Sequence, residues 1–114
     1  MAPGKRRWTL PGARALLPDV RERTALAVAE VQALLDRRDR EGSTDASTEQ
    51  LDALVAKVTS GWVRAMEAFG LEVKGLWLID FDSGSGCYCW RWPEPELSYF
   101  HGYDEGFVGR VRIQ

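Results

Sequence analysis

The sequence lacks most of the features that identify common functional classes. Its net charge is only −2 over 114 residues, which argues against a general nucleic-acid binder, because such a protein needs a broad cationic surface. None of its apolar runs approaches the ~20 residues that span a bilayer. The basic start MAPGKRRWTL is not followed by the apolar segment of a secretory signal, so we expect a cytoplasmic protein.

Catalytic and metal-binding motifs are equally scarce. The chain has no GxSxG nucleophile elbow, no P-loop, no GxGxxG after a strand and no HExxH zinc motif. Its two cysteines, Cys87 and Cys89, are too close in sequence for a secreted disulfide framework and are expected to be reduced. No motif therefore indicates a reaction.

The first half of the chain, residues 9–70, is predicted to form an antiparallel helical hairpin. Its periodicity predicts a short helical turn over 10–17 and then a helix from Pro18 to Glu41, because proline cannot donate to a helix backbone. A second helix is expected over 48–69. One hairpin cannot bury both apolar seams, so either the sheet packs on it or a second copy does. A homodimer through the hairpin is the expected assembly.

A basic tail over residues 1–8 precedes the hairpin and contains Lys5, Arg6, Arg7 and Trp8. One interpretation is a contact with nucleic acid in which Trp8 stacks on a base. The other is a solvated tail whose Trp8 docks on the body of the protein, and the acidic total charge favours it.

Alternating apolar residues follow the hairpin and predict a small antiparallel sheet over 75–114. The chain as a whole is therefore predicted to be a single α+β domain, 1–114, with three to four strands. The strands are expected over 76–81, 87–92, 96–101 and, as a short edge strand, 108–113.

A candidate metal site follows from the register of this sheet. A three-residue connection over 93–95 places Cys87, Cys89 and His101 on one face. With Asp104 close behind, the side chains of Cys89, His101 and Asp104 could hold a divalent metal such as zinc. The structural alternative is that the cysteines fill small core spaces, while His101 hydrogen-bonds Asp104 or the carboxylate after it.

Charged residues of the same region form a candidate ligand patch. A guanidinium that grips a carboxylate or phosphate would bind an anion or a small metabolite here. Alternatively, arginine–glutamate pairs would clamp the hairpin between the strands. The candidate ligand-binding residues are Arg91, Glu94, Glu96, His101, Asp104 and Arg110.

Three aromatic residues, Trp90, Trp92 and Phe100, are expected on the opposite face of the sheet. Such side chains could stack bases, as in proteins that bind single strands. No RNA-recognition signature accompanies them, so we favour a core that packs on the helices.

The order of these residues is similar to that of one family. The matching stretches are WTL, ARALLP, GLEVKG and IDF, followed by CWR, Glu94, Glu96, YFH, Asp104, GF and GR. The chain resembles the small bacterial proteins grouped as domain of unknown function 2203. The resemblance implies no activity, but it supports as site positions Cys89, Arg91, Glu94, His101, Asp104 and Arg110. Cys87 lies outside the pattern.

These observations leave three hypotheses for function. The first is a non-enzymatic module that binds a small ligand or a protein through the polar loops of the sheet. The second is a metal-dependent hydrolase in which His101 and Asp104 hold an ion that activates water. The third and weakest is nucleic-acid binding through the basic tail and the tryptophans.

Overall fold

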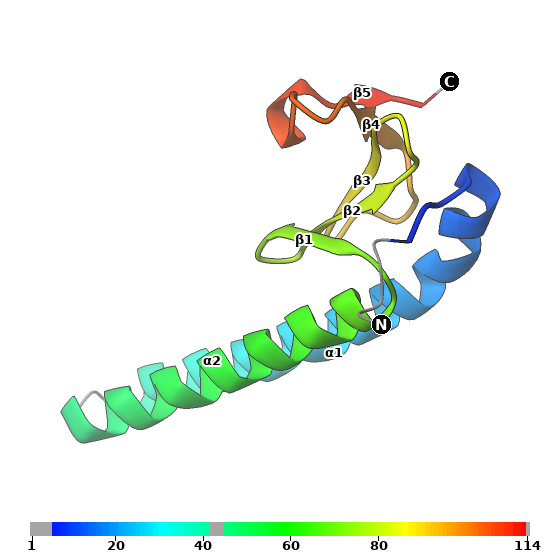
Figure 1. Cartoon of the computed structure of the whole chain (residues 1–114). Coiled ribbons are helices and arrows are strands. Elements are labelled where there is room, and N and C mark those ends of the chain that lie inside the picture. Colours follow the sequence, from blue (N-terminus) through cyan, green and yellow to red (C-terminus); the bar gives the residue numbers. More distant parts are fainter. Residues whose placement is uncertain (1–5, 42–44, 114) are drawn as a thin grey trace, which may run out of the picture.

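The computed structural model describes residues 6–41 and 45–113, and it consists of a helical hairpin and a five-stranded antiparallel sheet (Figure 1). The α+β prediction is confirmed, although the sheet has more strands than predicted. Its order is β1-β2-β3-β4-β5, so each strand pairs with the next one in the chain. The elements are α1 (Leu10–Glu41), α2 (Asp45–Ala68), β1 (Glu72–Gly75), β2 (Leu78–Asp82), β3 (Cys87–Arg91), β4 (Tyr99–His101), a 3-10 turn (Phe107–Gly109) and β5 (Val111–Arg112).

Helix α1 is a single helix that continues through Pro18. The predicted break before Pro18 is wrong. A proline inside a helix costs about 3 kcal/mol, but the turns on either side of it bury Ala13, Leu17 and Val20 in the core. Burial of each large apolar side chain recovers roughly 1.5–3 kcal/mol, which offsets that cost.

Helix α2 runs antiparallel to α1 and begins three residues earlier than predicted. A buried chain of hydrogen bonds joins the two helices. Trp62 Nε1 of α2 donates to Thr24 Oγ1 of α1 at 2.9 Å, and this hydroxyl donates to the Val20 carbonyl at 2.7 Å. The helix ends before Gly70, whose φ of 87° is readily adopted only by glycine. No helix within 6–41 and 45–113 is long and apolar enough to cross a membrane.

Strand β1 was not predicted. It pairs with β2 through Glu72↔Asp80 and Val73↔Ile79, and the tight turn between them places Trp77 at a φ of 60°. Four residues are too few for a clear alternating pattern, so the sequence showed only the longer apolar strand after them. The addition of β1 places Glu72 beside Asp80.

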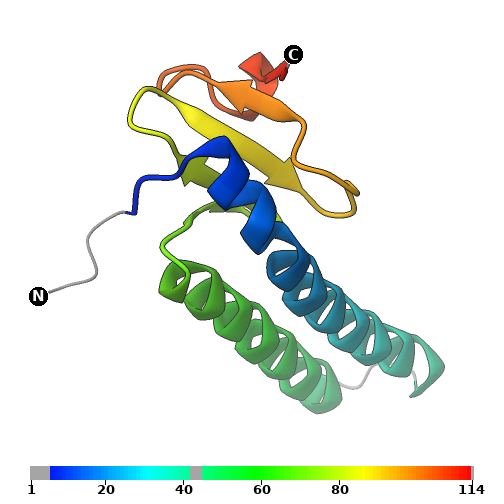
Figure 2. The same ribbon diagram turned by 90° about the vertical axis from the view of Figure 1, so that its right-hand side faces the viewer.

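The inner face of the sheet packs on the first turns of α1, which cross it (Figure 2). Ile79, Phe81 and Trp90 are each 0% exposed there, so the prediction of an aromatic core is confirmed for Trp90. Trp8 is 5% exposed and meets Phe81 edge to face at 5.3 Å between ring centroids. It therefore docks on the body, as the second interpretation of the tail predicted, whereas Lys5 lies outside the described residues.

Candidate functional site

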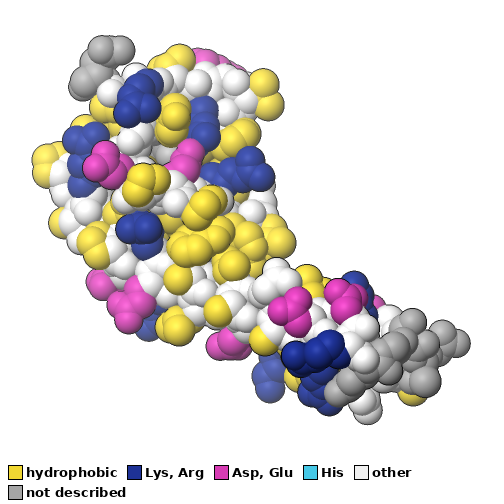
Figure 3. Space-filling view, turned by 180° about the vertical axis from the view of Figure 1, so that it is seen from behind, with side chains coloured by type: hydrophobic (Ala, Val, Ile, Leu, Met, Phe, Trp, Pro, Cys, Tyr) yellow, Lys and Arg dark blue, Asp and Glu magenta, His cyan; other side chains and the backbone are white. Residues whose placement is uncertain are grey.

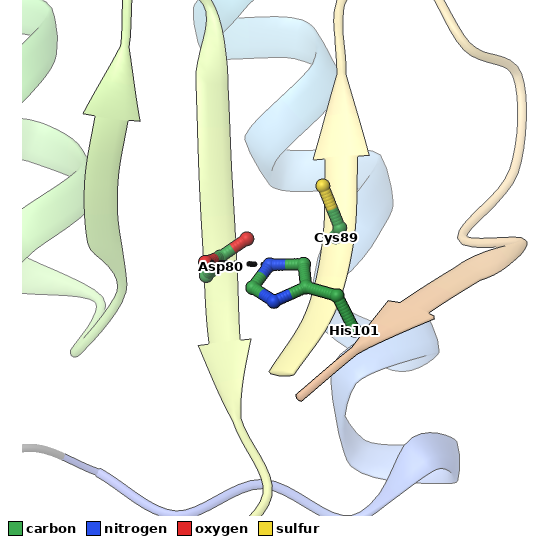
Figure 4. Close-up of side chains that lie close together, drawn as sticks. All are labelled: Asp80, Cys89 and His101. Atoms are coloured by element: carbon green, nitrogen blue, oxygen red, sulfur yellow. Dashed lines mark ion pairs between the residues drawn. The ribbon is translucent and has the colours of Figure 1, made fainter. Parts of the chain in front are cut away.

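The outer face of the sheet carries a buried group of three polar side chains. Asp80 of β2, Cys89 of β3 and His101 of β4 are 1%, 1% and 4% exposed. One potential ligand atom from each lies within 4.8 Å of the others. His101 reaches across β3 toward Asp80, and Cys89 comes from the strand between them (Figure 4).

The sequence predicted the register that creates this group. The observed pairs Cys87↔His101 and Cys89↔Tyr99 have the register expected from a connection over 93–95, although β3 and β4 are shorter than predicted and residues 92–98 connect them. The pair Asp80↔Cys89 adds the carboxylate from the other side of β3.

Both ring nitrogens of His101 face oxygen atoms. Nδ1 lies 2.8 Å from the Gly102 carbonyl, which can only accept, so Nδ1 carries a proton and donates it. Nε2 lies 2.9 Å from Asp80 Oδ2. A neutral imidazole would therefore turn the lone pair of Nε2 toward a carboxylate. That arrangement requires a cation, either a proton or a metal ion, beside these two atoms.

Asp80 is the least satisfied residue of the group. Nε2 of His101 forms an ion pair with Oδ2 at 2.9 Å, and within the described part of the chain neither carboxylate oxygen has a further hydrogen-bond partner. Burial of a carboxylate without hydrogen bonds costs several kcal/mol unless a cation compensates it.

The two cysteines are free, buried and held in the thiol form. Burial raises the pKa of the Cys89 thiol to about 12, and the negative charge of Asp80 adds to the effect, while Arg110 opposes it. Burial also raises the pKa of Cys87 to about 12, with further contributions from Asp80, Glu72 and Asp82. The negative potential that disfavours a thiolate here favours a cation.

A second group on this face shares Asp80. Ligand atoms of Glu72, Asp80 and Cys87 also lie within 4.8 Å of one another. Cys87 is 2% exposed and Glu72 is partly buried. Asp80 therefore stands between two sets of potential ligands.

A cavity of about 260 Å³ opens onto Asp80 and His101. The segment after β4 lines it with Tyr103, Gly106 and Phe107, and Lys74 and Leu78 complete it. The Tyr103 hydroxyl donates to Asp82 Oδ1 at 2.7 Å, which ties this segment to β2. The site is thus buried beneath the C-terminal segment but adjoins a space large enough for water or a small ligand.

The predicted clamp holds this C-terminal segment in place. Arg110 forms two contacts with Glu94, of 3.1 Å and 2.7 Å, and its guanidinium stacks between Tyr99 at 3.9 Å and Phe107 at 4.2 Å. Glu94 Oε1 also accepts from the Arg91 backbone N–H at 2.8 Å. The structural alternative for these charges therefore fits the geometry better than an open anion site.

The remaining predicted site residues do not gather at one place. Arg91 is exposed and its guanidinium lies 5.4 Å from the Phe107 ring. Glu96 is exposed beside Arg14, away from the outer-face group. Asp104 is exposed in the turn after β4 and is not part of the group, so the expected pairing of His101 with Asp104 is wrong. Asp80 pairs with His101 instead.

Asp80 was missed although the sequence carries a signal for it. It is an acidic residue between Ile79 and Phe81, in a run of otherwise apolar residues. A charged residue inside a strand that is buried on both faces needs a partner on its own face. The partner lies two strands away, and only the full pairing of the sheet identifies it.

The comparisons with known proteins agree with the resemblance. No curated protein and no solved structure matches this chain. The model of a family described as an uncharacterized conserved protein (DUF2203) matches residues 6–113, which is nearly the whole chain and includes both the hairpin and the outer-face group. The chain therefore belongs to the DUF2203 family.

Proposed function

We propose that the protein is a metal-binding module in which Asp80, Cys89 and His101 hold a divalent ion. The observation that carries the proposal is the buried Asp80 carboxylate, whose Oδ2 lies 2.9 Å from the His101 imidazole and which has the Cys89 thiol beside it. The Gly102 carbonyl orients the ring of His101 through Nδ1, as backbone carbonyls commonly do for histidine ligands of metals, and leaves Nε2 for the ion.

The set of ligand atoms supports zinc over other ions. One nitrogen, one oxygen and one sulfur suit zinc, whereas magnesium and calcium prefer oxygen alone. Two ligands of a tetrahedral zinc ion lie about 3.3 Å apart, given bonds of about 2.0–2.1 Å. The 2.9 Å between Nε2 and Oδ2 is close to this value, so binding needs only small side-chain movements.

Native mass spectrometry tests the proposal against the bare mass of 12.8 kDa. We expect untagged protein to carry an excess mass that a chelator removes and that zinc restores. Cys89→Ser and His101→Ala should each lose the ion held by Asp80, Cys89 and His101, while the exposed-carboxylate variant Asp104→Asn should retain it. Circular dichroism checks that each variant is folded. A wild-type protein that binds no zinc at micromolar concentration would refute the proposal.

A hydrolase is a second candidate, favoured by the cavity beside the group. Three protein ligands leave the fourth position of a zinc ion open, and the cavity adjoins Asp80 and His101. An ion there would lower the pKa of bound water enough to make it a nucleophile near neutral pH. Ester and phosphoester substrates assayed with zinc-loaded protein and with Cys89→Ser test this candidate, and equal rates for the two would exclude it.

We infer a homodimer as part of the proposal. A groove of about 730 Å³ lies between α1 and α2, and Leu26 and Leu54 beside it are 60% and 41% exposed. Figure 3 shows apolar side chains gathered where the hairpin leaves the sheet. A second hairpin on this face would complete a four-helix bundle. Sedimentation of the wild type and of Leu26→Glu tests the assembly, and a wild-type monomer would refute it.

The proposal includes a cytoplasmic location, supported by the two free thiols, because such thiols persist in reducing compartments. A site for a peptide or metabolite at the Arg91, Glu94 and Arg110 cluster has less support, because Arg110 is already paired and stacked. Binding of nucleic acid is weakened in the same way by the burial of Trp8.

A further inference from the structure

We propose that the outer face of the sheet binds two divalent ions, bridged by the carboxylate of Asp80. This inference rests on the proposed function and extends it to a second ion, held by Glu72, Asp80 and Cys87. The first ion uses Asp80, Cys89 and His101. Both sets of ligands already have their potential ligand atoms within 4.8 Å.

Asp80 is the shared element of the two groups. It lies in β2, the strand between β1 and β3, and pairs with Glu72 on one side and Cys89 on the other. Its side chain is 1% exposed, and neither oxygen has a hydrogen-bond partner among the described residues. A carboxylate has two oxygens, so each is available to one ion. Two-metal sites place their ions about 3.5–4 Å apart, a separation that one carboxylate can bridge.

Charge balance supports two ions rather than one. Once an ion displaces the proton of the Cys89 thiol, the first set supplies two negative charges, from the Asp80 carboxylate and the Cys89 thiolate, which neutralise one divalent ion. Glu72 and the Cys87 thiolate supply two more. The Lys74 ammonium lies 3.5 Å from Glu72 Oε2 and is exposed, so an ion can replace it there at little cost in free energy.

The two cysteines provide a matched pair for this inference. They lie one residue apart in β3, on the same face, and are 2% and 1% exposed. Cys89 belongs to the group with His101, and Cys87 belongs to the group with Glu72. As core fillers they would be equivalent. As ligands they hold different ions.

The test is a titration of the metal-free protein with zinc, followed by native mass spectrometry, and with cobalt, followed by sulfur-to-metal charge-transfer absorption. We expect two ions per chain in the wild type. Cys87→Ser should bind one ion and keep about half of the cobalt–thiolate absorption. Glu72→Gln, a conservative change on the edge strand, should also bind one ion. Asp82→Asn, which removes a nearby charge outside both groups, should still bind two.

The outcomes separate this inference from the proposed function. Wild-type protein that binds one ion, with Cys89→Ser losing it and Cys87→Ser retaining it, would overturn the second ion and leave the first. Wild-type protein that binds none would overturn both. If both Cys87→Ser and Glu72→Gln still bind two ions, the second ion lies elsewhere and Asp80 does not bridge the two ions. If Cys87→Ser fails to fold, Glu72→Gln alone decides between these results.

Discussion

The two faces of the sheet are buried to the same degree but by opposite chemistry. On the inner face Ile79, Phe81 and Trp90 are 0% exposed and pack into the apolar core. On the outer face Asp80 and Cys89, which alternate with them along β2 and β3, are 1% exposed. The inner face therefore stabilises the fold by removing apolar surface from water. The outer face buries a carboxylate, and this burial removes no apolar surface from water.

The difference lies in what covers each face. The inner face meets a helix, whereas the outer face lies beneath a short segment that the Arg110–Glu94 pair and the Tyr103–Asp82 hydrogen bond tie down. A stable fold does not require polar groups at this depth, and an apolar outer face would cost less. Local departures from the most stable arrangement are often found at functional sites, so the outer face is where the metal site is proposed.

Truncation of the inner face should have the largest effect on stability. We expect Trp90→Ala to lower the free energy of unfolding by about 3–5 kcal/mol, because it removes the largest fully buried side chain and leaves a cavity. Trp92→Ala, at a half-buried ring in contact with Trp90, is the matched control and should cost less. Urea denaturation measures both. Equal losses would show that the depth of burial of a ring on the inner face does not determine its contribution to stability.

Replacement of Asp80 and His101 on the outer face should not lower the free energy of unfolding of the metal-free protein, in contrast to truncation of the inner face. We expect Asp80→Leu combined with His101→Leu to leave the free energy of unfolding unchanged or to raise it by about 1–3 kcal/mol, because a buried ion pair is often less stabilising than apolar groups of similar size. The same variant should bind no zinc. Denaturation in chelator measures the first effect. A large loss of stability would mean that Asp80 and His101 are structural.

High pH should destabilise the metal-free protein through the two buried thiols of the outer face. The thiols of Cys87 and Cys89 have an ordinary pKa of 9.0 in the unfolded chain and about 12 in the folded one. Above pH 9 the unfolded chain therefore holds fewer protons than the folded chain, so the free energy of unfolding falls as pH rises toward 12. The slope is on the order of 1 kcal/mol per pH unit for each thiol.

The double variant Cys87→Ala/Cys89→Ala checks this assignment. Its free energy of unfolding should fall less steeply than that of the wild type between pH 9 and 11, when both are measured by urea denaturation in chelator. If the free energy of unfolding fell equally steeply with pH in the two proteins, the thiols would not be the cause of the loss of stability at high pH.

The sequence predicted the hairpin, the α+β fold and the register between β3 and β4, because each depends on neighbours in the chain. Periodicity locates the helices, and a three-residue connection determines which residues of two strands face each other. The pairing of Cys87 with His101 followed from this alone. The continuation of α1 through Pro18 was not predictable from local rules, because it depends on the core that Leu17 and Val20 enter.

Only the part of the site that depends on neighbouring strands was predictable from the sequence. Cys89 and His101 were identified because they lie on strands joined by a short connection. Asp80 was not, because its relation to His101 spans two strand pairings, and a nearer acid, Asp104, offered a simpler partner. Proximity in sequence is a poor guide to the partner of a buried charge, whereas the alternation of faces, followed across all the strands, identifies it.

A weaker contact between Arg110 and Glu94 should have the smallest effect on stability but should make Cys89 clearly more accessible to reagents. Arg110→Lys keeps the charge but loses the two-point contact with Glu94 and the stacking between Tyr99 and Phe107. We expect a loss of about 1 kcal/mol in the free energy of unfolding and several-fold faster alkylation of Cys89 in the folded protein. Arg112→Lys, whose guanidinium lies 6.0 Å from the Tyr99 ring, is the control and should leave both values near those of the wild type. Unchanged alkylation in Arg110→Lys would mean that the C-terminal segment covers the site without help from the clamp, and the burial of Asp80 would then depend on the strands alone.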